Sequence, residues 1–243
     1  MDSVDSYAST FLALAYRAYM TGNAGLQALV AGNITTLEAI AALLVNPVPN
    51  GVRVNSGPVA GLTEPLPGYN AVFTMDNVET WAGLNDLAAL EDALGRQSQQ
   101  SYYQGYANAT VDALETELWN PATGTWDQSA TETGGQWSVT TSDVATWYPD
   151  AVIQLWPIAW QLVTSASTYA QDSWTAFVSA WPNWDANRTG GTVPYASMAR
   201  AGQAMGDTAG ASTLLSTFES QGPLWPWPWS ADQAGWVLRT AAH

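Results

Sequence analysis

"DSVDSYASTFLALAY", residues 2–16, has a near-copy later in the chain, and this pair of segments decides the predicted fold. The copy is "DNVETWAGLNDLAAL", residues 76–90, in which Asp76 stands where Asp2 stands in the first segment. The same spacing, applied once more, reaches Asp150 in "YPDAVIQLWPIAW". Self-similarity at a fixed spacing indicates an architecture assembled from one repeated unit. The sequence therefore predicts three helices that each begin with an aspartate in the same register.

Helical periodicity dominates the rest of the chain, because apolar residues recur every three or four positions. We predict an all-α fold in one domain over residues 1–243, with about nine helices and short β-hairpins in the longer connections. One hairpin is expected around "NPATGTWDQ", residues 120–128. The predicted helices span 3–21, 23–45, 76–94, 97–118, 150–166, 168–180, 194–206, 208–221 and 230–241.

The charge balance and the rare residue types restrict the chemistry. The chain has 21 acidic residues against 6 basic ones, all arginine, and a formal net charge of −15. Such a surface repels nucleic acid and anionic lipid, so we expect neither as a partner. An excess of acidic residues is also typical of highly soluble proteins and of proteins from salty or acidic habitats. There is no cysteine, and the one histidine is His243. Triads built on histidine are therefore excluded from the interior, and proton transfer falls to carboxylates.

No apolar run in the sequence approaches the length of a membrane span, and no signal peptide is visible. We expect a secreted or extracellular protein if a signal peptide has been removed, and a cytoplasmic one otherwise. The oligomeric state is not indicated by the sequence.

Alternating apolar and amphipathic helices predict a toroid of helical hairpins, with the apolar helices forming the inner ring. In that arrangement the inner helices begin at one end of the ring, where Asp2, Asp76 and Asp150 would converge. Asp5 and Glu79 follow three residues after the first acid of their helices, on the same side. The alternative interpretation is helix capping, since acids at these positions stabilise helix N-termini.

Three segments carry a resemblance to a known family: "DSVDSYASTFLALA", "YNAVFTMDNVETWAGLNDLAAL" and "WYPDAVIQLWPIAWQL". They resemble the (α/α)6-toroid, or six-hairpin, glycosidases of bacteria, and distantly the inverting endoglucanases and chitosanases of glycoside hydrolase family 8. The first is similar to that family's D-x-D helix start, whose aspartates act on the sugar and on water. The third is similar to its Y-D-A-x-R-x-P-W helix, with Gln154 in place of the arginine.

This resemblance implies hydrolysis of a β-linked polysaccharide or oligosaccharide by two carboxyl groups, with no cofactor and no metal. The candidate catalytic residues are Asp2, Asp5, Asp76, Glu79 and Asp150. Asp5 or Asp2 would be the base that holds water, and Asp76 or Glu79 the acid. The candidate sugar-binding residues are Tyr7, Trp81, Trp147 and Tyr148, because aromatic rings with polar tips suit sugar faces.

Two departures from the family pattern are expected to matter. The family has six hairpins, whereas nine helices make four and a half, and its general-acid glutamate precedes the D-x-D helix. Either another acid serves, or the ring is incomplete. The alternative functions are therefore a carbohydrate-binding or structural toroid that lacks the general acid, and an interaction scaffold that uses the tryptophan-rich strip at 225–229.

Overall fold

The computed structural model describes residues 3–186, 195–221 and 231–241, and this part of the chain is mostly helical. The predicted all-α class is therefore confirmed, while the closed ring of a toroid stays a prediction. Contacts divide the chain into two compact units. The first unit holds 1–119 and 128–140, and the second holds 120–127 and 141–243. Compact units of this kind also occur as parts of one domain, so the single-domain interpretation stays a prediction.

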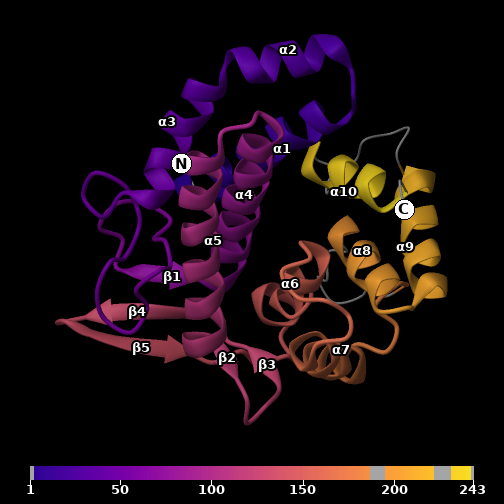
Figure 1. The fold of residues 1–243 in the computed structure, drawn as a ribbon. Coiled ribbons are helices and arrows are strands. Elements are labelled where there is room, and N and C mark those ends of the chain that lie inside the picture. The colour runs from indigo at the N-terminus through magenta and orange to yellow at the C-terminus, as the bar shows by residue number, and fades with distance from the viewer. Residues whose placement is uncertain (1–2, 187–194, 222–230, 242–243) are drawn as a thin grey trace. The chain divides into compact units, whose positions relative to one another are not determined.

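Five helices make up most of the first unit (Figure 1). They are α1 (Val4–Met20), α2 (Ala24–Gly32), α3 (Ile34–Val45), α4 (Thr74–Ala93) and α5 (Gln97–Glu117). The single helix predicted over 23–45 is instead two helices, α2 and α3, bent by 59°. The break lies at Asn33, whose side-chain amide donates to the carbonyl of Leu29 at 2.9 Å. Asparagine side chains compete with helical hydrogen bonds in this way, which explains why one helix ends and another begins there.

Helices α1 and α4 lie side by side and run parallel, with the two copies of the sequence repeat in register. The hydroxyl of Ser3 contacts Asp76 and the hydroxyl of Ser6 contacts Glu79, each pair 73 residues apart in the chain. The predicted convergence of these two helix starts is confirmed. Figure 1 also shows α5 returning antiparallel beside α4. Between them, α1, α3, α4 and α5 bury a core of leucine, valine and alanine side chains.

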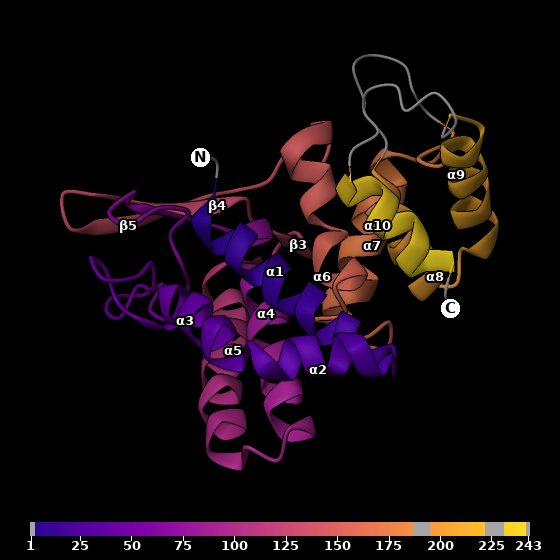
Figure 2. The same ribbon diagram turned by 90° about the horizontal axis from the view of Figure 1, so that it is seen from above.

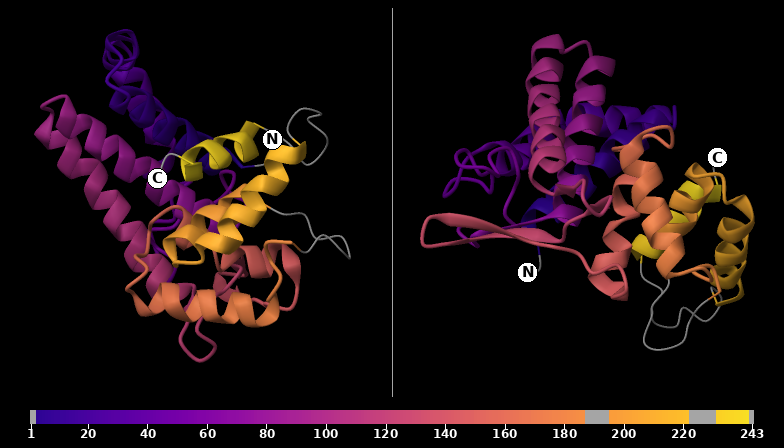
Figure 3. Two further views of the ribbon diagram at one scale, coloured as in Figure 1. Left: turned by 90° about the vertical axis from the view of Figure 1, so that its right-hand side faces the viewer. Right: turned by 90° about the horizontal axis from the view of Figure 1, so that it is seen from below.

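Small sheets occupy the longer connections. Strands β1 (Ala71–Phe73), β4 (Ser129–Thr133) and β5 (Gln136–Thr140) form an antiparallel sheet in the first unit, in the order β1-β4-β5. Its β4–β5 hairpin is drawn in Figure 3. Strands β2 (Trp119–Asn120) and β3 (Thr125–Trp126) form the hairpin predicted around 120–128, which is confirmed.

The second unit is an assembly of short helices, several of which Figure 2 shows together. They are the π-helical segment η1 (Trp147–Ala151), α6 (Trp156–Ala159), α7 (Thr168–Ala180), α8 (Ala196–Ala204), α9 (Thr208–Gln221) and α10 (Ala231–Ala241). The continuous helix predicted over 150–166 is wrong. Pro157 lacks the amide hydrogen that a continuous helix would use, and Gln161 has a positive φ of 66°.

The described residues hold several long or apolar helices. No single helix there is long and apolar enough to span a bilayer. The bent pair α2 and α3 reaches that length and composition only when its two helices are taken together.

Candidate functional site

The starts of α1 and α4 bring three of the predicted acids together, and local sequence explains how α1 begins. Ser3 is the N-cap of α1, and its hydroxyl accepts a hydrogen bond from the amide of Ser6. Serine is a favoured N-cap because its oxygen satisfies an amide that has no partner within the helix. Asp5 lies in the first turn of α1 and Asp76 in the first turn of α4, where the positive ends of the helix dipoles favour acids.

Asp5 lies at the bottom of this cluster and is fully buried. Its Oδ1 accepts hydrogen bonds from the Ser3 hydroxyl and from the amide of Ser6, the latter at 2.9 Å. Its Oδ2 accepts from the hydroxyl of Thr63 at 2.8 Å. Burial raises the pKa of the Asp5 carboxyl above its usual range, and these hydrogen bonds reduce the rise only in part.

Thr63 is held against Asp5 by Asn77 of α4. The side-chain oxygen of Asn77 accepts from the Thr63 amide at 2.7 Å, and its nitrogen donates to the Thr63 carbonyl at 3.0 Å. The Thr63 hydroxyl also lies 3.1 Å from the hydroxyl of Thr80. All three residues are buried, so the connection before β1 is fixed to α4 by paired polar groups.

Asp76 and Glu79 belong to the same cluster and, unlike Asp5, are partly exposed. The Ser3 hydroxyl donates to Asp76 at 3.1 Å, and the Ser6 hydroxyl donates to Glu79. Ser3 therefore contacts two carboxyl groups, and the oxygens of Asp5 and Asp76 that it joins are at most about 6 Å apart, two hydrogen-bond lengths.

The remaining two candidate acids do not belong to this described cluster. Asp2 lies outside the described residues. Asp150 lies in the second unit, where it is partly exposed and its Oδ1 accepts from the amide of Asp143 at 3.0 Å. It sits in the π-helical segment η1 and does not begin a long helix as predicted. Its place beside Asp76 stays a prediction.

The four candidate sugar-binding residues have different surroundings. Tyr7 is 64% exposed on α1, next to the acids in sequence, whereas Trp81 is partly buried and packs against the core. Trp147 is buried, and its ring meets Trp181 edge to face with centroids 4.9 Å apart. Tyr148 is 55% exposed and stacks on another tyrosine ring. Only the tyrosines thus present a large part of their rings to solvent.

Sequence reasoning missed the polar residues that hold the acids. Ser3 and Ser6 carried a signal, because they stand at the N-cap and in the first turn of a predicted helix. Thr63 carried none, since it lies in a long connection and reaches Asp5 only through the tertiary fold. Asn77 lies inside a helical stretch, where its polar side chain reads as solvent-facing.

Comparisons with known proteins add no family to this picture. No protein-family model matches the chain, and no curated protein is significantly similar to it. Over the described residues, no group of three or more histidine, cysteine, aspartate or glutamate side chains is arranged to hold a metal ion. The candidate site therefore consists of carboxyl and hydroxyl groups at two adjacent helix starts.

Proposed function

We propose that this protein is a carbohydrate-active enzyme of the six-hairpin toroid type, which hydrolyses a β-linked polysaccharide or oligosaccharide by carboxylate acid–base chemistry. The proposal follows the resemblance of its repeated helix starts to those glycosidases. It is supported by the parallel pairing of α1 and α4, which gathers Asp5, Asp76 and Glu79 at one end of the two helices.

The observation that carries the proposal is the position of the Ser3 hydroxyl between Asp5 and Asp76. A hydroxyl has one hydrogen and can donate it to one carboxylate at a time. Contact with two carboxyl oxygens is therefore most favourable when one carboxyl is protonated and donates to the serine. The raised pKa of the buried Asp5 fits this arrangement. General acid catalysis needs a carboxyl group whose pKa lies above its usual range, which is the direction of the shift at Asp5.

In this mechanism Asp76 and Glu79 are the residues that meet the substrate, because they are partly exposed whereas Asp5 is not. They stand three residues apart on one helix face, with Cβ atoms about 5–6 Å apart. One protonates the leaving glycosidic oxygen and the other acts on water or the sugar, as carboxyl pairs of glycosidases do. Asp5 is a positioning residue that keeps a proton within the cluster through Ser3.

The test measures release of reducing ends from β-glucans, xylan and chitosan by single variants. Asp76→Asn and Glu79→Gln are expected to lower kcat by about 10²-fold or more, the usual contribution of an acid or base. Asp2→Asn and Asp150→Asn test the two acids whose positions relative to the cluster are not described. Asp112→Asn, at an exposed position on α5, is the matched control and should leave the rate unchanged. Hydrolysis that survives all these changes would contradict the mechanism.

A second candidate function is a carbohydrate-binding or structural toroid without turnover. The observation in its favour is that both oxygens of Asp5 are already occupied by hydrogen bonds, as in a purely structural cluster. Calorimetry with cello-, xylo- and chito-oligosaccharides separates the two candidates. Saturable binding without any reducing-end release would favour this second function. The scaffold hypothesis concerns the strip at 225–229, which lies outside the described residues.

A further inference from the structure

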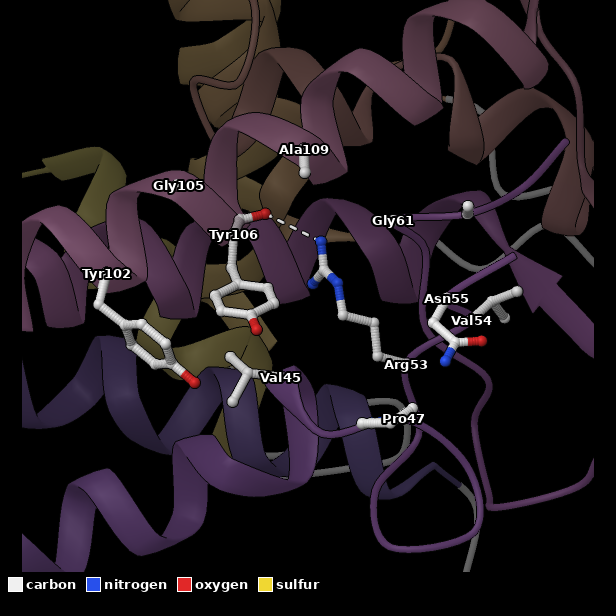
Figure 4. Close-up of a pocket in the computed structure, with 11 residues that line it drawn as sticks. Val45, Pro47, Arg53, Val54, Asn55, Gly61, Tyr102, Gly105, Tyr106 and Ala109 are labelled. Atoms are coloured by element: carbon white, nitrogen blue, oxygen red, sulfur yellow. Dashed lines mark hydrogen bonds between the residues drawn. The ribbon is translucent and has the colours of Figure 1, made fainter. Parts of the chain in front are cut away.

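A pocket in the first unit, away from the acidic helix starts, contains an unusual buried cation. The pocket has a volume of about 490 Å³ and lies between the end of α3, the connection that follows it and the middle of α5. Figure 4 shows the side chains around it. Its size falls within the range of pockets that hold small molecules. The residues that line it are Val45, Pro47, Arg53, Val54, Asn55, Ala60, Gly61, Tyr102, Gly105, Tyr106 and Ala109.

Arg53 is only 5% exposed, and its guanidinium group has few partners. Nη2 donates to the carbonyl of Tyr106 at 3.1 Å and to the hydroxyl of Thr110 at 3.4 Å. The guanidinium carbon lies 4.7 Å from the centre of the Tyr106 ring. Nη1 is buried and has no hydrogen-bond partner. Figure 4 shows the Arg53 and Tyr106 side chains next to each other within the pocket lining.

The charge of Arg53 is not balanced by an acid of the pocket, since every other lining residue is uncharged. Burial lowers the pKa of Arg53 to about 10, a value at which the group still carries its charge near neutral pH. Buried charges in proteins are normally paired, because desolvation without a partner costs several kilocalories per mole. In a chain with 21 acids and 6 arginines, a buried arginine without a carboxylate is therefore an exception that needs a reason.

Backbone hydrogen bonds hold the connection that carries Arg53 in one position. The Arg53 amide donates to the carbonyl of Asn46 at 3.1 Å, and the Arg53 carbonyl accepts from the amide of Val48 at 3.3 Å. The same connection rests on α5 at Gly61, whose φ is +107° and where a Cβ would stand 2.7 Å from the Ala109 carbonyl. These contacts hold the backbone that carries Arg53, whose guanidinium lies over the Tyr106 ring of α5.

We propose that this pocket binds a small organic carboxylate, with the carboxylate group on Arg53 and the body of the ligand against Tyr102 and Tyr106. Guanidinium groups pair with carboxylates through charge-assisted hydrogen bonds, and Nη1 supplies a free donor. Aromatic faces accept either a sugar ring or another aromatic ring, and Tyr102 is 46% exposed with its ring 5.1 Å from that of Tyr106. The ligand is thus a sugar acid or an aromatic acid. This inference does not depend on the proposed hydrolase activity.

Calorimetric titration of the full chain with glucuronate and with benzoate tests the proposal and separates the two sources of the carboxylate. Glucose and benzamide serve as the uncharged partners of these probes. We expect saturable binding of at least one carboxylate and affinity lower by about tenfold or more for its uncharged analogue, as for loss of a charge-assisted pair. Arg53→Gln should reduce the affinity for the carboxylate by a similar factor.

Gly105→Leu provides a second variant that does not remove a buried charge. A Cβ at Gly105 meets nothing within 4 Å, and leucine favours helix more than glycine does, so this variant should fold at least as stably as the parent. Its side chain would occupy the pocket and abolish binding. Arg17→Gln removes the same charge from an arginine whose side chain is 48% exposed, and should bind like the parent.

Three results would overturn the proposal. One is the absence of saturation by either carboxylate up to about 20 mM, which is about twentyfold above the dissociation constant of a weak, 1 mM ligand. Another is equal affinity for the charged and uncharged members of both pairs. The third is unchanged carboxylate affinity in the Gly105→Leu variant, which decides the matter even if Arg53→Gln fails to fold.

Discussion

Gly83 of α4 lies against Ser9 of α1 so closely that a Cβ on Gly83 would stand 2.6 Å from both the Cα and the carbonyl oxygen of Ser9. Real Cβ atoms do not approach backbone to that distance, so the absence of a side chain sets how near the two helices can come. The approach in turn allows Ser3 and Ser6 of one helix to reach the acids of the other. The packing of two helix backbones and the geometry of the acidic cluster are therefore linked.

Gly83→Ala should destabilise the protein by about 1–3 kcal/mol, because an added methyl group must push the helices apart. Alanine has a higher helix propensity than glycine by about 1 kcal/mol, so the expected loss of stability is what remains after this favourable contribution. Urea unfolding measures the change. Gly105→Ala is the matched control, since its Cβ would meet nothing within 4 Å, and it should raise stability. Equal responses of the two variants would contradict the close helix contact.

Asp5→Asn should increase the free energy of unfolding at pH 7 relative to the parent, because asparagine carries no charge to bury. Burial raises the pKa of Asp5 in the folded state above its unfolded value near 3.8. The folded state then holds the proton more tightly, so the stability that the neutral acid provides is present below pH 3.8. It is lost as pH rises through the raised value.

The measurement for Asp5 is the difference in unfolding free energy between variant and parent from pH 4 to pH 7. That difference should grow with pH, because asparagine resembles the neutral acid at every pH. Asp112→Asn, at an exposed position, should show no such trend. A difference for Asp5→Asn that shrinks with rising pH would mean that the ionised carboxylate is the stabilised form.

Arg96→Gln should cost about 3 kcal/mol at pH 7, because it leaves the fully buried Glu91 without its cation. Arg96 Nε lies 3.2 Å from Glu91, and Arg96 Nη2 lies 2.6 Å from Glu38. Burial raises the pKa of Glu91, Arg96 opposes that rise, and Glu38 adds to it. The loss should therefore be smaller at pH 5 than at pH 7, because Glu91 without the arginine is protonated more readily as pH falls.

Unfolding by urea at the two pH values measures this effect. Arg17→Gln is the control, since Arg17 pairs with Asp86 at 3.5 Å and its side chain is 48% exposed. Asp86 is buried but Arg17 is half exposed, so water can partly replace this cation and the control should cost less than Arg96→Gln. An Arg96→Gln loss equal to that of the control would show that the buried glutamate does not need its partner.

Gln154→Leu should destabilise the protein by about 2–4 kcal/mol. Gln154 is fully buried, and its side-chain amide bonds both the amide and the carbonyl of Trp126, at 2.7 and 2.8 Å. Leucine would leave two buried backbone groups unpaired, each at a cost of about 1–3 kcal/mol. Calorimetry measures the change as a shift in the melting midpoint. Gln171→Leu, at an exposed position of α7, is the control and should leave the midpoint nearly unchanged. Similar midpoints for both variants would refute the role of Gln154.

Gln154 also illustrates a limit of the resemblance. The resemblance to glycoside hydrolase family 8 predicts an arginine at this position, whereas the Gln154 amide of this protein bonds the β3 backbone. An amide can donate and accept at once, whereas an arginine only donates, so the substitution suits two opposite backbone groups. The role of Gln154 thus follows from the backbone groups that it bonds and not from the sequence motif.

The sequence by itself determined most helix positions and the register of two of them. Periodicity placed α1, α4, α5 and α7 within about two residues, because each buries an apolar face over several turns. The repeat predicted that Asp2, Asp5, Asp76, Glu79 and Asp150 would gather. Contacts of Ser3 and Ser6 join the helix starts that carry Asp5, Asp76 and Glu79, whereas Asp2 lies outside the described residues and the place of Asp150 beside them stays a prediction. Periodicity misplaced the helix after Asp150, where Pro157 interrupts a strongly apolar stretch.

Only the tertiary structure decided the environment of each charged group. Asp5 and Glu79 occupy equivalent positions of the repeat, yet Asp5 is fully buried and Glu79 is partly exposed. The difference arises because Thr63, far from Asp5 in the chain, closes over one carboxyl and not the other. Arg53 likewise carried no signal until a connection and a helix enclosed it. Desolvation and hydrogen bonding depend on atoms brought together from distant segments, which no local pattern records.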